Sequence, residues 1–121
     1  MDELIGRLVA NVGVDRTAAE TAVGIILQFL SKEGPPDKVQ VLIDKLPGAA
    51  AAIAAAPPDS SAGGMFGGGV MAVGTRLMGA GLSIGQVQAV TREIIGYARE
   101  KVGEDAVGEI VGAIPGLGQF V

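Results

Sequence analysis

The sequence predicts an all-α fold, in the form of a compact multi-helix bundle built from two internally repeated helical units with pseudo-two-fold symmetry. Apolar residues recur at helical spacing, and no segment shows the sustained alternation bounded by hairpin turns that is typical of a strand. The same pattern returns without a gap at an offset of 68 residues, as expected of a supersecondary unit stacked on its copy. The matched pairs are Gly13 with Gly81, Ile26 with Ile94, Phe29 with Tyr97, Asp37 with Asp105, Val39 with Val107, and Pro47-Gly48 with Pro115-Gly116.

The repeat divides one predicted domain, residues 1–121, into two units and a connection. The first unit spans residues 2–56 and the second spans residues 70–121. Residues 57–69 between them are rich in Gly, Pro and Ser, a composition typical of a flexible connection. Because a unit of about 50 residues is marginal on its own, we expect both units to share one core.

The first unit is expected to contain four helices. Asp2 begins an amphipathic helix that ends at Gly13, and Asp15 caps a long helix that continues to about Glu33. Gly34-Pro35-Pro36 stops the long helix, because proline cannot continue it. Two shorter helices follow, one opened by Asp37 and ended by Pro47-Gly48, the other over the alanine-rich residues 49–56.

The second unit repeats this plan. A helix from near Val70 to Ala80 stops at Gly81, and Ser83 caps a long helix over residues 84–102. We expect this helix to cross its counterpart, residues 16–33, at the centre of the bundle. Gly103 closes it, Glu104-Asp105 opens a third helix that ends before Pro115-Gly116, and the tail 117–121 is too short for a full helix.

Composition excludes several classes of function. The net charge is −4 and Lys and Arg are not clustered, which argues against binding to nucleic acid. The chain begins Met1-Asp2-Glu3, unlike a secretory signal. The longest weakly charged stretch, residues 60–91, is interrupted by Arg76 and many glycines, so no membrane span is expected. These features predict a cytoplasmic protein.

Few residues suited to catalysis are present. The chain has no His and no Cys, which excludes Ser-His and Cys-His nucleophiles and the usual zinc sites. We therefore predict a protein that is not an enzyme, with no catalytic residue, cofactor or metal. Four carboxylates that lie close in sequence could ligate magnesium, but negative charge at helix ends is the favoured interpretation. They are Glu100, Glu104, Asp105 and Glu109.

Other motifs also favour structural roles. Tyr97 is predicted to be a core residue with a polar tip. Arg92 and Arg99 share a helix face and could bind an anion, but side chains that are solvated or paired with neighbouring Glu residues are favoured. The glycines at 67–69 and 79–81 follow no strand, so neither a P-loop nor a dinucleotide-binding loop is supported. Ile114-Pro115-Gly116-Leu117-Gly118 looks like the hairpin of helix-hairpin-helix modules, but no helix or basic residue follows, and a helix stop is favoured.

Large apolar residues in the connection and the tail form the candidate interaction surface. Such residues either dock on their own domain or bind a partner. They are Met65, Phe66, Leu117, Phe120 and Val121.

The sequence also resembles a bacterial family of small uncharacterised proteins typified by VcgC and VcgE. The resemblance rests on Gly13-Val14-Asp15, the run from Leu42 to Gly48, the glycine-rich connection and Gly81-Leu82-Ser83. It implies an all-helical bacterial protein and carries over no activity and no functional residue.

Together these features predict a non-enzymatic interaction or self-association module, whose partner is another protein or a second copy of this chain. Exchange of a unit between chains would give a swapped homodimer. The alternative is a carrier of a small apolar or lipid-like ligand, held between the two units in a pocket lined by Ala, Met, Val and Leu.

Overall fold

The computed structural model describes residues 2–46, 48–55, 69–114 and 117–120, except for the side chains of Asp2, residues 69–72, Gln119 and Phe120. These ranges contain seven α-helices and one short 3₁₀ helix, and they contain no strand. The all-α prediction is therefore confirmed. The helices are α1 (Asp2–Val12), α2 (Arg16–Glu33), α3 (Pro36–Lys45), α4 (Ala49–Ala55), α5 (Gly69–Gly79), α6 (Ile84–Val102) and α7 (Glu104–Ala113), and the 3₁₀ helix is η2 (Leu117–Phe120).

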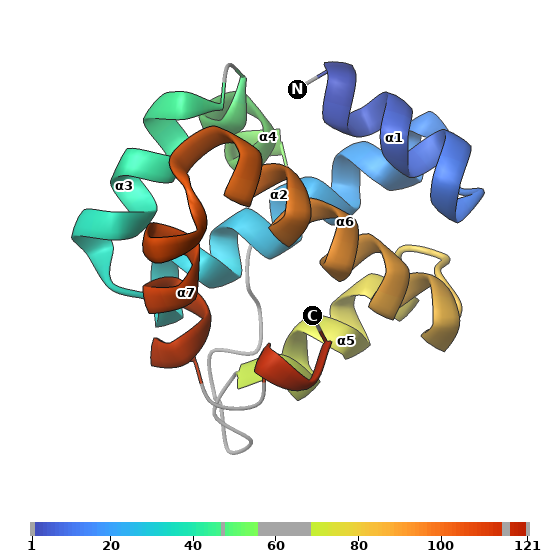
Figure 1. The fold of residues 1–121 in the computed structure, drawn as a ribbon. Helices are drawn as coiled ribbons and strands as arrows, with labels where there is room; N and C mark the ends of the chain where they lie inside the picture. The colour runs from blue at the N-terminus through green and yellow to red at the C-terminus, as the bar shows by residue number, and fades with distance from the viewer. Residues whose placement is uncertain (1, 47, 56–68, 115–116, 121) are drawn as a thin grey trace.

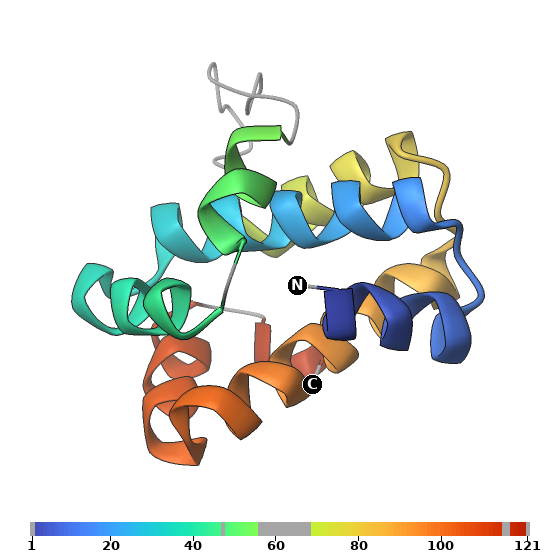
Figure 2. The same ribbon diagram turned by 90° about the horizontal axis from the view of Figure 1, so that it is seen from above.

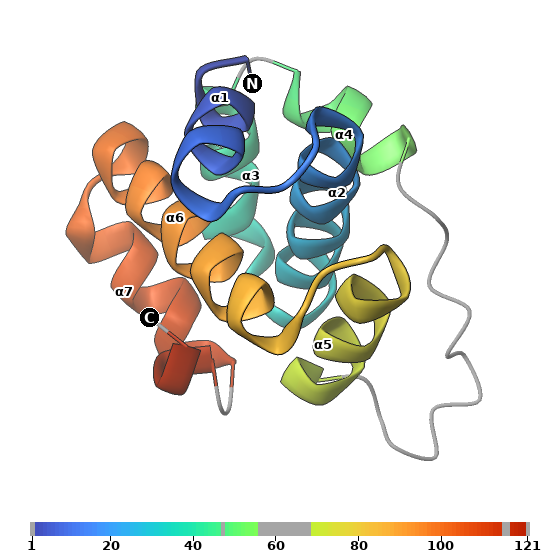
Figure 3. The same cartoon turned by 90° about the vertical axis from the view of Figure 1, so that its right-hand side faces the viewer.

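The two long helices, α2 and α6, contact each other inside the bundle, and each is also packed against α1 and α5. Figure 3 shows α1 above this pair and α5 below it. Helices α3 and α7 pack on each other, α4 packs on α2, and η2 packs on α6 and α7. Figures 1 and 2 show α3 and α7 at one end of the molecule and the α1–α2 and α5–α6 connections at the other.

One hydrophobic core joins both parts of the chain. Its largest fully buried side chains come from α1, α2 and α3 as well as from α5, α6 and α7, so neither half encloses a core by itself. These residues are Leu4, Leu8, Val23, Ile25, Ile26, Leu27, Leu30, Leu42, Leu77, Ile94, Ile95 and Ile110.

Glycine makes the two turns that precede the long helices. Gly13 has a φ of +84° and Gly81 a φ of +104°, a left-handed conformation that costs glycine little because it has no Cβ. Each turn reverses the chain, so that α1 folds back on α2 and α5 folds back on α6. The predicted stops at these two glycines are confirmed.

The helix starts differ in part from the predictions. Ser83 caps α6 as predicted, and its side chain forms a capping box with Gln86. Asp15 precedes α2, but its side chain makes no capping hydrogen bond. Helix α3 begins at Pro36 rather than at Asp37, because proline suits the first turn, where its missing N–H has no helical partner.

No helix in the described ranges is both long enough and apolar enough to cross a lipid bilayer.

Candidate functional site

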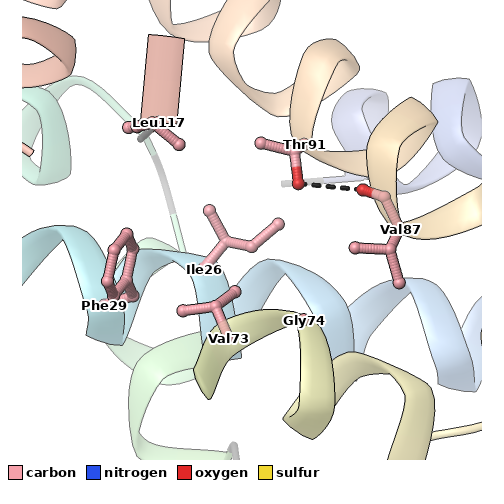
Figure 4. A pocket seen from close by; sticks show the side chains of 7 residues that line it. All are labelled: Ile26, Phe29, Val73, Gly74, Val87, Thr91 and Leu117. Carbon is pink, nitrogen blue, oxygen red and sulfur yellow. Dashed lines mark hydrogen bonds between the residues drawn. The ribbon is translucent and has the colours of Figure 1, made fainter. Parts of the chain in front are cut away.

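An apolar pocket lies where α2 faces α5, α6 and η2 (Figure 4). Its enclosed volume is about 10 Å³, room for about one water molecule, and the whole concavity out to solvent measures about 300 Å³. Ile26 and Phe29 come from α2, Val73 and Gly74 from α5, Val87 and Thr91 from α6, and Leu117 from η2.

Helical spacing brings these side chains to the pocket. Ile26 and Phe29 are three residues apart and Val87 and Thr91 are four apart, so each pair lies on one face of its helix. Val73 and Leu117 approach from separate elements and are buried, with 7% and 3% of their surface exposed. The wall is therefore made of side chains that also belong to the core.

Thr91 supplies the only polar side chain among the described lining residues. It is 5% exposed, and its hydroxyl Oγ1 donates a hydrogen bond to the carbonyl oxygen of Val87 at 2.9 Å. Figure 4 shows this bond running along α6 at the edge of the pocket. A threonine hydroxyl has one proton and two lone pairs, so the oxygen can still accept a hydrogen bond from a ligand.

Gly74 leaves space in the wall that α5 contributes. A Cβ added to Gly74 would meet no heavy atom within 4 Å. The first carbon of a larger side chain at this position would therefore meet no steric clash.

Leu117 closes the pocket from a short element. The backbone N–H of Leu117 donates to Ile114 O at 3.2 Å, and η2 contains only four residues. Among the elements that form the wall, η2 is the shortest.

A cluster of polar groups lies between α1 and α6, apart from the pocket. Arg7 makes two hydrogen bonds with Glu100, of 2.6 and 3.0 Å, and its guanidinium lies 5.1 Å from the centre of the Tyr97 ring. The hydrogen bond from Arg7 lowers the pKa of Glu100, while that same bond raises the pKa of Arg7. Lys101 lies 5.1 Å from the same ring centre, and Tyr97 is 3% exposed. These contacts join two helices and leave Glu100 engaged as an ion-pair partner.

The predicted interaction residues are placed only in part. Leu117 is buried and lines the pocket, so its side chain is docked on the domain. Met65, Phe66 and Val121 lie outside the described residues, as does the side chain of Phe120.

The four carboxylates considered for magnesium are used separately where their contacts are described. Glu100 pairs with Arg7, and Glu109 pairs with Lys38 at 3.0 Å. In the part of the chain that the structure describes, no three acidic side chains are grouped so as to hold a metal ion. Arg92 and Arg99 are exposed on α6, and Ile114 ends α7 just before residues 115 and 116, which are not described.

Sequence reasoning missed the composition of the pocket. It expected a lining of Ala, Met, Val and Leu, whereas Ile, Phe, Gly and Thr accompany Val and Leu. One signal was available for Thr91, since it is the only Ser or Thr within α6 and lies next to Val90 on the apolar stripe of that helix.

The sequence matches no protein-family model, and searches of curated proteins and of solved structures return no match. The resemblance to the family typified by VcgC and VcgE therefore stays a prediction.

Proposed function

We propose that this protein is a non-enzymatic binding module that holds a small apolar group between two repeated helical units. The observation that carries the proposal is the pocket itself. Ile26 and Phe29 belong to the first proposed unit, and the other lining residues belong to the second. The absence of His and Cys from the sequence also favours binding over catalysis.

The bounds of the helices support the division into two units. Helix α2 begins at Arg16 and α6 begins at Ile84, while α3 begins at Pro36 and α7 at Glu104, and each pair is separated by the 68-residue offset of the sequence repeat. Hydrogen bonds recur at the same offset. Ala19 N donates to Asp15 O and Val87 N donates to Ser83 O, both at 2.8 Å.

Contacts between helices support the proposed pseudo-two-fold symmetry. Helix α1 packs on α6, and its counterpart α5 packs on α2. A two-fold relation between units would produce this exchange of partners. It would also explain why α2 meets α6 and α3 meets α7.

The proposed units differ in their last element, and the pocket lies beside the shorter one. Helix α4 has seven residues, whereas η2 has four. The longer helix brings an alanine-rich segment against α2, while η2 brings Leu117 to the pocket. At the 68-residue offset the pocket residues correspond to Ile94, Tyr97, Ile5, Gly6, Ala19, Val23 and Ala49.

The ligand must be small and must move part of the wall. An enclosed volume of about 10 Å³ leaves no room for a hydrocarbon ring, so Leu117 has to shift outward as the ligand enters. Apolar contact with the lining then replaces the contacts that Leu117 gives up. A single ring or the end of an alkyl chain fits this requirement better than a whole lipid.

Toluene is a suitable probe of the intact protein. We expect saturable changes in the amide NMR signals of Ile26, Val73 and Val87, together with a rise in the thermal unfolding midpoint. Leu117→Ala should tighten toluene binding, because it enlarges the enclosed space. If the wild-type protein shows no saturable change, the proposal is wrong even if Leu117→Ala binds.

A matched pair of glycine variants locates the site. Gly74→Leu should fill the pocket and abolish toluene binding, while Gly6→Leu should retain it. Both glycines lie in helices, correspond at the 68-residue offset, and have no heavy atom within 4 Å of an added Cβ. An equal loss of binding in the two variants would mean that toluene binds elsewhere.

A second candidate function is association with another copy of this chain, supported by exposed apolar side chains. Val9, Met78 and Ile84 are 40%, 45% and 67% exposed, and they belong to the ends of α1, α5 and α6 that share one end of the molecule in Figures 1 and 2. Light scattering over a wide range of concentration should then show a dimer that Ile84→Glu disrupts. A monomer throughout that range would eliminate this candidate.

A further inference from the structure

We infer that Thr91 makes the pocket selective for a neutral ligand that carries a hydroxyl group on its apolar body. This inference rests on the proposed function and names the chemical class of its ligand. It begins from the single polar side chain among the described lining residues, which is 5% exposed and lies on α6.

The proton of the Thr91 hydroxyl already forms a hydrogen bond within α6. Oγ1 donates to Val87 O at 2.9 Å, four residues earlier in the same helix, and Figure 4 shows the hydroxyl directed along that bond. What Oγ1 can offer a ligand is a lone pair, because a hydroxyl accepts as well as donates. Among the described lining residues, the side chains therefore present one acceptor and no free donor.

An acceptor in an apolar wall favours a ligand that brings its own O–H. If the ligand hydroxyl reaches Thr91 Oγ1, its proton is satisfied inside the protein. If the acceptor is missing, the buried hydroxyl of the ligand stays unsatisfied, which is the costly case for hydrogen bonds. A carbonyl or ether oxygen on the ligand would find no free side-chain donor among the described lining residues.

The uncharged lining disfavours charged analogues of such an alcohol, namely the carboxylate and the ammonium compound. The described lining residues include no Lys, Arg, Asp or Glu, so a carboxylate or an ammonium group would be desolvated without a partner. The ligand class is thus a small apolar alcohol, in preference to the corresponding acid or amine.

Three ligands with one ring test this inference: toluene, benzyl alcohol and benzoate. Burying a ligand hydroxyl costs desolvation free energy in any pocket. The informative quantity is therefore the ratio of the dissociation constants of benzyl alcohol and toluene, compared between the wild-type protein and variants of Thr91. We expect Thr91→Val to weaken benzyl alcohol by at least about fivefold relative to toluene, the range expected when a buried donor loses its acceptor. Thr91→Ser should restore the wild-type ratio, and benzoate should bind none of these proteins.

The outcomes separate this inference from the function on which it rests. If toluene does not bind the wild-type protein, the proposed function fails. If both bind and their ratio is the same in wild type and Thr91→Val, the pocket binds apolar groups but Thr91 does not select among them. Benzoate binding as tightly as benzyl alcohol would also overturn the inference.

Discussion

Arg7 of α1 and Glu100 of α6 form a two-pronged ion pair, with Nη1 2.6 Å from Oε2 and Nη2 3.0 Å from Oε1. The two residues are 93 positions apart in sequence, so their pairing ties the first helix of the chain to the second long helix. The Arg7 guanidinium also lies 3.6 Å from Glu3 and over the Tyr97 ring. The pair therefore adds a polar contact between α1 and α6, two helices that also pack on each other.

Glu100→Gln should remove a stabilisation that depends on pH. The Arg7 hydrogen bond lowers the pKa of Glu100 in the folded state, so the carboxylate stabilises the fold above the pKa of an unfolded glutamate. This contribution is lost as the pH falls through the lowered folded pKa. The midpoint of thermal unfolding should be higher for the wild-type protein than for Glu100→Gln at neutral pH, and the two midpoints should converge in acid.

Arg7→Gln provides the matched control for this effect, because it removes the other member of the same pair. Its difference from wild type should also shrink in acid and in high salt, where exposed ion pairs are screened. A gap between wild type and Glu100→Gln that stays constant from neutral pH to strong acid would contradict the assignment.

Gly96→Ala should stabilise the protein by about 0.5–1 kcal/mol, because alanine loses less conformational freedom than glycine in a helix. Gly96 lies inside α6, and a Cβ there would meet no heavy atom within 4 Å. Chemical denaturation would measure the change.

Gly34→Ala should instead destabilise the protein, by about 1–3 kcal/mol. Its Cβ would lie 2.7 Å from the carbonyl oxygen of Leu30 and 3.1 Å from a methyl carbon of Val39. If both alanine variants changed stability in the same direction, the described surroundings of these glycines would be wrong.

Ser83→Ala should cost about 0.5–2 kcal/mol, the usual effect of losing an N-cap. Ser83 Oγ accepts a hydrogen bond from Gln86 N at 3.2 Å, and Gln86 Oε1 accepts one from Ser83 N at 3.0 Å. Asp15→Ala is the control, since the Asp15 side chain makes no capping hydrogen bond and its loss should matter less. Equal costs in urea denaturation would show that the cap of α6 contributes nothing beyond helix propensity.

The helices could be predicted from sequence because local signals determine their bounds. The alternation of apolar stripes with Gly and Pro places the ends of α2 and α6 at Glu33 and Val102, as the structure has them. The cap at Asp15 could not be decided in this way, because an aspartate in the right position still has several rotamers and solvent as partners. A local sequence pattern therefore predicts the backbone conformation more tightly than it predicts the hydrogen bonds of one exposed side chain.

The pocket could be anticipated only as a region between two halves. Its lining depends on how far α5 lies from α2 and on where the chain after α7 returns, and neither is a local property of sequence. Leu117 illustrates the limit. From the sequence, this apolar residue is expected either to dock on its own domain or to bind a partner. Only the packing of η2 on α6 and α7 places it in the pocket wall.

Gln28→Ala should weaken the attachment of α4 to α2, although the Gln28 side chain is partly exposed. Gln28 Nε2 donates to Ile53 O at 2.8 Å, and Gln28 Oε1 accepts from Arg76 Nη2 at 2.8 Å, so one side chain joins α2 to both α4 and α5. Removing it takes away the hydrogen bond that holds the carbonyl of Ile53, at a cost of about 1–3 kcal/mol. Amide hydrogen exchange should accelerate in α4 before it accelerates in α6, because the lost hydrogen bond ends on α4.

Gln40→Ala is the matched control. Gln40 Nε2 also makes a hydrogen bond, to Asp44 Oδ1 at 3.0 Å, but both groups are exposed and its loss should change stability by less than about 0.5 kcal/mol. Unchanged exchange rates in α4 of Gln28→Ala would mean that apolar packing on α2 holds this helix without the hydrogen bond.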